Sequence, residues 1–252
     1  MRVGSLFSGI GGFDLGFERA GFDIAWQVEF DPFCQSILKK HWPNAKLYSD
    51  IREVKTDELQ PVDVLCGGFP CQPVSVSGKR KGRDDERWLW PEFARIVRGL
   101  RPTYVVVENV PGLLTVDGGR LFGTILGDLA ACGYDAEWQV LSAAALGAWH
   151  RRERLFIVAY SDCQRLAQRK KLKKDARPQQ PTAQRNCYCE RPTQSDYWRN
   201  NRPPEPLICR VDDGISSRVD SFRRKRLEAL GNAVVPQVAE FVARMILAHA
   251  QE

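Results

Sequence analysis

A cysteine stands on a glycine- and proline-rich stretch, Gly67-Gly68-Phe69-Pro70-Cys71-Gln72-Pro73, directly after an apolar run. The run predicts a buried strand, so the loop would expose Cys71 at the strand's carboxyl end. A thiol in that place can act as a nucleophile if a helix N-terminus or nearby cations lower its pKa. The cations that follow are Lys79, Arg80, Lys81, Arg83 and Arg87. Cys66, inside the run, is instead typical of a small buried hydrophobe.

Two further stretches supply an acid and a pair of cations. Glu108 closes a run of three valines, where a carboxylate is costly to bury unless it has a partner or a chemical task. From the residues alone, a structural hydrogen bond and acid catalysis are equally open. Arg152 and Arg154 lead into another apolar run, and strand geometry puts them on one face, so both could reach one site. A solvated strand entrance is the alternative.

A glycine-rich loop, Phe7-Ser8-Gly9-Ile10-Gly11-Gly12-Phe13, follows the first predicted strand. Its glycines allow a sharp turn and the close approach of a ligand, and the helix start after it favours an anionic group. Glu29 ends the second predicted strand, where an acid typically binds ribose hydroxyls. Asp50 and Ile51 follow the next extended stretch and could hold an adenine edge. The Gly-x-Gly-Gly spacing differs from the Gly-x-Gly-x-x-Gly of dinucleotide folds, so we predict a nucleoside cofactor and disfavour a dehydrogenase.

The elements that must position these residues alternate in type along residues 1–160. Short β-rich runs separated by amphipathic stretches predict a parallel α/β sheet with helices on both faces, which binds ligands at the carboxyl ends of its strands. Strands are expected over Arg2–Phe7, Ile24–Glu29, Val62–Gly67, Tyr104–Asn109, Ala136–Leu141 and Leu155–Tyr160. Helices are expected near Phe13–Ala20, Pro32–His41, Leu89–Leu100 and Gly119–Cys132.

The amino-acid composition changes in residues 161–226, where prolines, amides and arginines dominate and apolar residues occur singly. This segment carries 17 Lys and Arg against 8 Asp and Glu, whereas residues 1–160 carry 19 against 20. The excess favours a polyanion as partner, and a solvated basic loop is the alternative. Helical spacing returns after Pro236, so the last helix should pack on the first domain. We therefore predict one catalytic and cofactor-binding domain, residues 1–160 plus 227–252, carrying a small basic insertion, residues 161–226.

Composition narrows the class of protein. The chain has 252 residues, 43% hydrophobic and 27% charged, as in ordinary globular proteins. It has no run of roughly 18 apolar residues and no signal-peptide pattern, so we expect no membrane segment and a cytoplasmic protein with reduced thiols. Four cysteines in the basic segment could in principle hold zinc, but none form a Cys-x-x-Cys pair, so we predict no metal. They are Cys163, Cys187, Cys189 and Cys209.

Taken together, these stretches resemble the C5-cytosine DNA methyltransferase family over residues 1–160 and 227–250. The motifs Phe-x-Gly-x-Gly-Gly, Pro-Cys-Gln, Glu-Asn-Val, Arg-x-Arg and Gly-Asn-Ala-Val-Val-Pro occur in the family's order. The resemblance implies a Rossmann-like S-adenosylmethionine-dependent methyltransferase sheet with a small, irregular basic target-recognition insertion. It also implies that the protein flips cytosine out of double-stranded DNA and methylates its carbon 5.

The resemblance assigns roles to residues. It makes Cys71 the nucleophile toward carbon 6 and Glu108 the acid that engages the cytosine, while Arg152 and Arg154 match the arginine pair. We expect Arg152 to stabilise charge at the O2 side and Arg154 to orient Glu108 or the loop. Contacts to S-adenosylmethionine are expected from Phe7, Gly9, Ile10, Gly11, Gly12, Glu29, Phe30, Asp50, Ile51, Pro70, Asn232 and Val234. Contacts to DNA are expected from Gln72, Ser75, Ser77, Lys79 and Arg83.

Two departures from the family's pattern concern substrate positioning. His150 stands where the family usually has glutamine, and Arg87-Trp88-Leu89-Trp90 replaces smaller residues. Two other functions stay open: a catalytically silent DNA-binding protein, disfavoured by the intact Pro-Cys-Gln and Glu-Asn-Val, and an RNA cytosine methyltransferase. We expect a monomer on the nucleoid of a bacterium or phage-infected cell, and a cognate restriction endonuclease as partner stays open.

Overall fold

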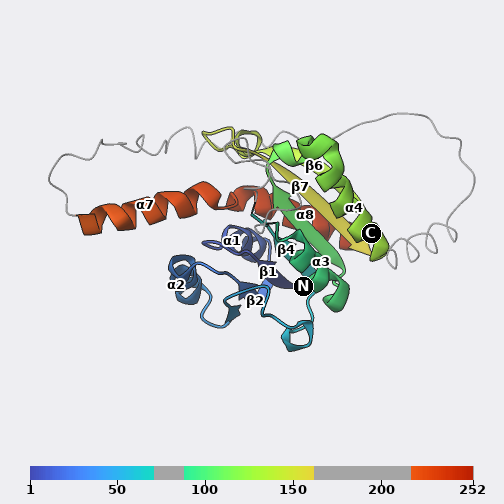
Figure 1. Ribbon diagram of the computed structural model, residues 1–252, viewed down its shortest axis with the longest axis horizontal. Helices are drawn as coiled ribbons and strands as arrows, with labels where there is room; N and C mark the ends of the chain where they lie inside the picture. Colours follow the sequence, from blue (N-terminus) through green and yellow to red (C-terminus); the bar gives the residue numbers. More distant parts are fainter. Residues whose placement is uncertain (71–87, 162–216, 252) are drawn as a thin grey trace, which may run out of the picture.

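The computed structural model describes residues 1–70, 88–161 and 217–251, and Figure 1 shows their arrangement around one sheet. The seven described strands lie in the order β3-β2-β1-β4-β5-β7-β6. The strands are β1 (Arg2–Leu6), β2 (Asp23–Val28), β3 (Lys46–Tyr48), β4 (Val64–Gly67), β5 (Tyr104–Asn109), β6 (Tyr134–Ser142) and β7 (Glu153–Ser161). The helices are α1 (Gly12–Arg19), α2 (Pro32–His41), α3 (Trp90–Leu100), α4 (Arg120–Ala131), α7 (Ser217–Asn232) and α8 (Pro236–Gln251).

The sheet is mixed rather than parallel throughout, which corrects the expectation from the sequence. Strands β3, β2, β1, β4 and β5 pair in parallel, whereas β7 is antiparallel to both β5 and β6. The physical reason lies in the connection. Residues 143–152 return the chain from β6 to β7 with only one 3-10 turn, Ala143–Leu146, and a parallel pair would need a longer crossover. Alternation of strands and helices does not report strand direction.

The central strands are buried on both faces, which explains their continuous apolar runs. In β5, Val105 and Val107 pack with the cluster that includes residues of α3 and α4. Val106, between them, packs with the cluster that includes residues of α1 and α8. Two layers of helices therefore enclose the sheet, and the polar loops are left at the ends of the strands.

Helix α8 packs on the first domain, as predicted. Its apolar residues Val238, Val242 and Ile246 are buried in the cluster that also holds Phe13 and Phe17 of α1. Helix α7 begins at Ser217, so helical structure crosses the predicted domain boundary at residue 227. The low apolar content of α7 hid it from a reading based on hydrophobic spacing. The division into two domains stays a prediction.

One stretch of the described chain, Lys225–Gln251, has the length and composition of a membrane-spanning helix. The apolar side of α8 is buried against α1 and the sheet, as in the core helix of a globular domain. Leu227, Leu230 and Met245 in the same stretch are exposed, so burial accounts for only part of its apolar composition.

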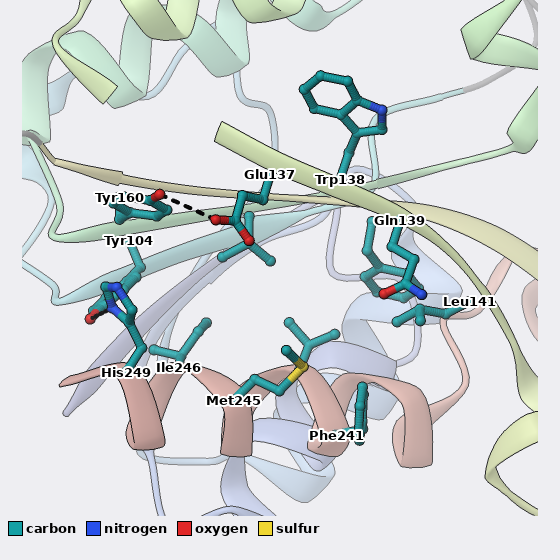
Figure 2. A pocket seen from close by; sticks show the side chains of 13 residues that line it. Tyr104, Glu137, Trp138, Gln139, Leu141, Tyr160, Phe241, Met245, Ile246 and His249 are labelled. Carbon is teal, nitrogen blue, oxygen red and sulfur yellow. Dashed lines mark hydrogen bonds between the residues drawn. The ribbon is translucent and has the colours of Figure 1, made fainter. Parts of the chain in front are cut away.

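Helix α8 leaves part of the flank formed by β6 and β7 uncovered. A hollow of about 200 Å³ lies there. Figure 2 shows the apolar side chains of Phe241, Met245 and Ile246 on one side of it. At its polar end the Tyr104 hydroxyl lies 2.9 Å from Nδ1 of His249. Since Tyr104 begins β5, this end lies away from the carboxyl ends of the parallel strands, where the predicted site residues gather.

Candidate active site

The predicted site residues meet at one edge of the sheet because the strand register brings their loops together. Leu6 of β1 pairs with Val28 of β2 and with Gly67 of β4, so the loops after these strands are neighbours. Asn109 at the end of β5 pairs with Leu155 near the start of β7. The glycine loop, the loop that leads to Cys71, and the segments with Glu108 and Arg154 therefore share this edge, as the sequence predicted.

The glycine loop turns sharply between β1 and α1. Gly9 and Gly11 have φ values of 56° and 86°, a region that favours glycine, and Phe7 adopts φ 53°. The Glu29 carboxylate accepts hydrogen bonds from the Gly9 amide at 2.6 Å and the Asp31 amide at 2.8 Å. Burial raises the pKa of Glu29 above its ordinary value. Glu29 thus holds the loop to the end of β2, and its oxygens retain lone pairs that could accept further donors.

The turn between α7 and α8 packs directly on the glycine loop. A side chain at Gly12 would overlap the Val234 carbonyl oxygen, and one at Gly16 would lie 2.6 Å from the Pro236 carbonyl oxygen. Only glycine permits this approach of the two backbones. The contact brings Val234, some 220 residues away in the sequence, to the predicted cofactor loop, and Asn232 lies two residues before it at the end of α7.

Glu108 and Arg154 form an ion pair in which the carboxylate is buried and the guanidinium is partly exposed. Nε of Arg154 lies 3.0 Å from Oε1 of Glu108, whose exposed fraction is 8%. Burial raises the pKa of Glu108 to about 7, against the opposing charges of Arg154 and then Arg152. A carboxyl group with this pKa can carry a proton near neutral pH, as a general acid must. The expectation that Arg154 orients Glu108 agrees with this contact.

The loop before Cys71 is held against the end of β5. Nδ2 of Asn109 donates to the Phe69 carbonyl at 3.2 Å, and its Oδ1 accepts from the Val110 amide at 2.9 Å. A side chain at Gly68 would lie 2.6 Å from Oε2 of Glu108, so the loop passes close to the acid. Asn109 was missed as a positioning residue, although the Glu-Asn-Val motif contained it.

Arg152 joins the acid to the turn between α7 and α8. Its Nη2 donates to the Ala233 carbonyl at 2.6 Å, and its charge acts on the Glu108 carboxyl. The sequence left open whether Arg152 and Arg154 reach one site or stand at a solvated strand entrance, and in the structure both act on Glu108. The expected role of Arg152 at the O2 side of a base stays a prediction.

The predicted cofactor contacts that follow β2 and β3 lie at the same edge of the sheet as the glycine loop and differ in exposure. The Asp50 carboxylate binds Arg52, with Nη2 and Oδ2 2.7 Å apart, and this hydrogen bond lowers the pKa of Asp50. Ile51 is buried, and its carbonyl accepts a 2.7 Å hydrogen bond from Nη2 of Arg95. Phe30 has an exposed fraction of 69%, which leaves its ring available to stack on a base.

The remaining residues that the sequence analysis singled out fall into three groups. Ile10 and Pro70 are half-buried at the same edge of the sheet. Cys66 is buried, as predicted, and burial raises the pKa of its thiol. The rest lie outside the described residues, namely Cys71, Gln72, Ser75, Ser77, Lys79, Arg83 and the four cysteines of the basic segment.

The structure explains one of the two departures from the family pattern. Trp88 and Trp90 are buried, and both rings pack against Phe69, so they support the loop that leads to Cys71. The Trp90 indole also donates to Asp128 at 2.7 Å. The ring of His150 packs edge-on against the exposed Trp149, with the centroids 5.3 Å apart. The structure gives no reason for histidine at position 150.

Sequence reasoning also missed a polar cluster beneath the glycine loop, made of Ser5, Ser8, Asp14 and Gln27. All four side chains are buried. The one signal in the sequence was a charged residue, Asp14, next to Phe13 in an amphipathic stretch. The same signal is typical of a solvated helix face, so it did not identify the cluster.

Comparisons with known proteins agree with this geometry. The Type II methyltransferase M.Bsp6I of Bacillus sp. (strain RFL6) is 37% identical over 164 residues, which are 64% of this chain and 52% of the relative. The Type II methyltransferase M.HhaI of Haemophilus parahaemolyticus is 34% identical over 161 residues, 64% of this chain and 49% of the relative. The chain thus spans about half the length of these relatives.

Two solved structures share the fold. An E. coli prophage protein described as a DNA modification methyltransferase is 28% identical, with a TM-score of 0.58 over 66% of this chain and 48% of its own. Spodoptera frugiperda DNMT2 has a TM-score of 0.53 at 23% identity over 64% of this chain and 50% of its own, which supports the fold alone. Residues 1–204 match the family described as C-5 cytosine-specific DNA methylase, and the chain belongs to that family.

Proposed function

We propose that this protein is a DNA cytosine-5 methyltransferase that uses S-adenosylmethionine as methyl donor. The observation that carries the proposal is Glu108, a buried acid with a pKa of about 7 beside the loop that leads to Cys71. Family membership supports the same reaction.

The residues present suit the proposed cofactor. The glycine loop leads into the start of α1, and the space beside Gly9 is open to a ligand, whereas Gly11 and Gly12 make room for Trp42 and for the Val234 carbonyl. Glu29 can accept from ribose hydroxyls, and the exposed ring of Phe30 can stack on adenine. S-adenosylmethionine, when bound, supplies an electrophilic methyl group.

The chain's own residues would make carbon 5 of cytosine nucleophilic. The Cys71 thiolate adds to carbon 6, forming a sulfur–carbon bond and an enamine whose carbon 5 accepts the methyl group. Glu108 donates a proton or a hydrogen bond at ring N3 and assists the addition. Arg154 holds Glu108 in position, and Arg152 stabilises charge that develops at the O2 side. A base then removes the proton from carbon 5, and the thiolate leaves.

The substrate would be a cytosine flipped out of double-stranded DNA, because the reacting atoms cannot be reached inside a stacked duplex. Residues 161–226 would bind phosphates and select the sequence, with Gln72, Ser75, Ser77, Lys79 and Arg83 near the flipped nucleotide. Binding should weaken with salt, with a log–log slope of roughly −0.9 per phosphate neutralised. We expect a monomer acting on the nucleoid. The Type II names of the relatives favour a cognate restriction endonuclease.

A duplex that contains 5-fluorocytosine tests the proposal, because fluorine cannot leave carbon 5 as a proton does. The full chain, given S-adenosylmethionine and a pool of such duplexes, should form an adduct that survives denaturation. The Cys71→Ser variant should form none. An adduct with that variant, or none with the folded wild type, would contradict the assignment.

Two controls separate the alternative functions. Bisulfite sequencing of DNA from cells that express the wild type should show protected cytosines in one sequence context. A protein that binds duplex DNA and leaves every cytosine unprotected would be catalytically silent. In a parallel assay on tRNA and duplex DNA, methylation of tRNA alone would favour the RNA methyltransferase.

A further inference from the structure

A buried carboxylate lies directly beneath the glycine loop. Asp14, in the first turn of α1, is 0% exposed. Its Oδ1 accepts a 2.7 Å hydrogen bond from Nε2 of Gln27 in β2, and its Oδ2 accepts one from the Ser5 hydroxyl of β1 at 3.2 Å. One side chain therefore joins a helix to two adjacent strands beneath the predicted cofactor loop.

The cluster continues from Asp14 into the loop itself. The Ser8 hydroxyl lies 3.0 Å from the Ser5 hydroxyl oxygen and 3.2 Å from the Ser5 carbonyl. The Ser8 amide donates to the Val28 carbonyl at 3.1 Å, and the Gly11 amide donates to the Ser8 carbonyl at 2.9 Å. Ser8 thus fixes the loop at both ends, and Ser5 connects it to Asp14.

The charged neighbours of Asp14 do not explain why a carboxylate is buried here. Glu18 on α1 carries the same sign, and the Cys66 thiol of β4 is kept neutral because burial raises its pKa. Hydrogen bonds from Gln27, Ser5 and the Asp14 amide are what favour the ionised form. Burying a carboxylate is costly when, as among the residues that the structure describes, no cation acts on it, so a role beyond packing is expected.

We propose that Asp14 is a positioning residue for the cofactor: its carboxylate orients Ser5 and Ser8 and so holds the glycine loop in the conformation that binds S-adenosylmethionine. The inference rests on the proposed function. Asp14 acts through Ser8 and does not itself touch the cofactor.

The direction of the hydrogen bonds makes the proposed role of Asp14 depend on its protonation state. An ionised Asp14 accepts from Ser5, which leaves the Ser5 oxygen able to accept from Ser8. Burial raises the pKa of Asp14 to about 6. The protonated acid would donate a hydrogen bond to the Ser5 hydroxyl and so reverse the direction of the hydrogen bonds from Asp14 through Ser5 to Ser8. In the Asp14→Asn variant, the amide can still accept from Gln27 but must donate to Ser5, so it mimics the protonated form at every pH.

The test compares Asp14→Asn with wild type and with a matched control. Tyr134→Phe removes another buried hydrogen bond, from the Tyr134 hydroxyl to the Pro102 carbonyl at 2.5 Å, far along the chain from the glycine loop. Calorimetric titration gives the Kd for S-adenosylmethionine, steady-state kinetics give kcat and KM, and urea denaturation gives the free energy of unfolding.

We expect Asp14→Asn to raise both Kd and KM for S-adenosylmethionine about tenfold, which is about 1.4 kcal/mol, with kcat at saturating cofactor changed less than about twofold. Tyr134→Phe should lower stability and leave Kd and KM unchanged. The wild-type Kd should rise as the pH falls through about 6, and this rise should be smaller in Asp14→Asn. Glu29, whose pKa is also raised, should keep its own contribution in both proteins.

A folded Asp14→Asn variant with wild-type Kd and KM would overturn the proposal, whatever its stability. If that variant fails to fold, Ser8→Ala replaces it: a severalfold higher Kd supports the proposal, and an unchanged Kd overturns it. A folded wild type that binds no S-adenosylmethionine would instead contradict the proposed function.

Discussion

Replacing Arg154 by methionine should change the pH dependence of the proposed reaction. The substitution keeps an unbranched side chain and removes the guanidinium that lies 3.0 Å from Oε1 of Glu108. Without that charge, the ionised form of Glu108 loses its strongest stabilising neighbour, and the pKa of about 7 should rise further. The acid would then keep its proton to higher pH.

The size of the change follows from the burial of the pair. A hydrogen bond to a buried charged group contributes about 1.5–3 kcal/mol, and a pKa change of one corresponds to 1.36 kcal/mol. The Arg154 side chain is 25% exposed, so solvent screens part of its effect and we use the lower end of the range. The pKa of Glu108 should therefore rise by about one.

The assay is the pH profile of kcat/KM, which reports the ionisation of essential groups in the free enzyme. If protonated Glu108 is required, the wild-type profile should fall above about pH 7, and in Arg154→Met the fall should begin about one pH unit higher. The maximum should also be lower, because Glu108 is less well positioned.

Arg151→Met is the matched control, since Arg151 is exposed in the same segment and the charge change is identical. In the Arg151→Met profile, kcat/KM should fall at the same high pH as in the wild type. An Arg154→Met profile that coincides with that of Arg151→Met would refute the idea that the Arg154 guanidinium sets the ionisation of Glu108.

Two further predictions concern stability. Folding raises the pKa of Glu108 from 4.5 to about 7, so the contribution of this group to stability is fully present below pH 4.5 and is lost as the pH rises through 7. Urea denaturation should therefore show the free energy of unfolding falling between pH 4.5 and 7. The fall should be smaller in Glu108→Gln. Gly12→Ala should cost about 1–3 kcal/mol by overlap with the Val234 carbonyl, whereas Gly123→Ala in α4, with nothing within 4 Å, should stabilise slightly; equal effects in urea denaturation would contradict the packing argument.

The fold could be predicted where local pattern and burial agree. The expected bounds of Tyr104–Asn109 and Pro32–His41 match β5 and α2, because the first is an unbroken apolar run and the second begins at a proline after an aspartate N-cap. The three-residue strand β3 was noted only as an extended stretch, and the polar sequence of α7 carries little hydrophobic periodicity. Strand direction in β6 and β7 depends on a connection whose path the pattern does not reveal.

In the candidate site, too, some features could be predicted from the sequence and others could not. Glu108 and Arg154 stood out in the sequence as charged residues at the ends of apolar strands, and the sheet register brings them together, while their catalytic roles stay predictions. The hydrogen bond from Arg152 to Ala233 was not predictable, since it joins segments 81 residues apart through a carbonyl that every residue type carries. Asp14 was missed because a charged residue on a helix usually faces solvent.

The turn between α7 and α8 links the two halves of the site. Val234 packs on Gly12 of the cofactor loop, and the neighbouring Ala233 carbonyl binds Arg152, whose charge acts on Glu108. A displacement of this turn would therefore move the proposed cofactor loop and the proposed acid together. The backbone carbonyls of the Gly-Asn-Ala-Val-Val-Pro motif thus contact both parts of the proposed site: Val234 packs against the glycine loop, and Ala233 accepts the hydrogen bond from Arg152.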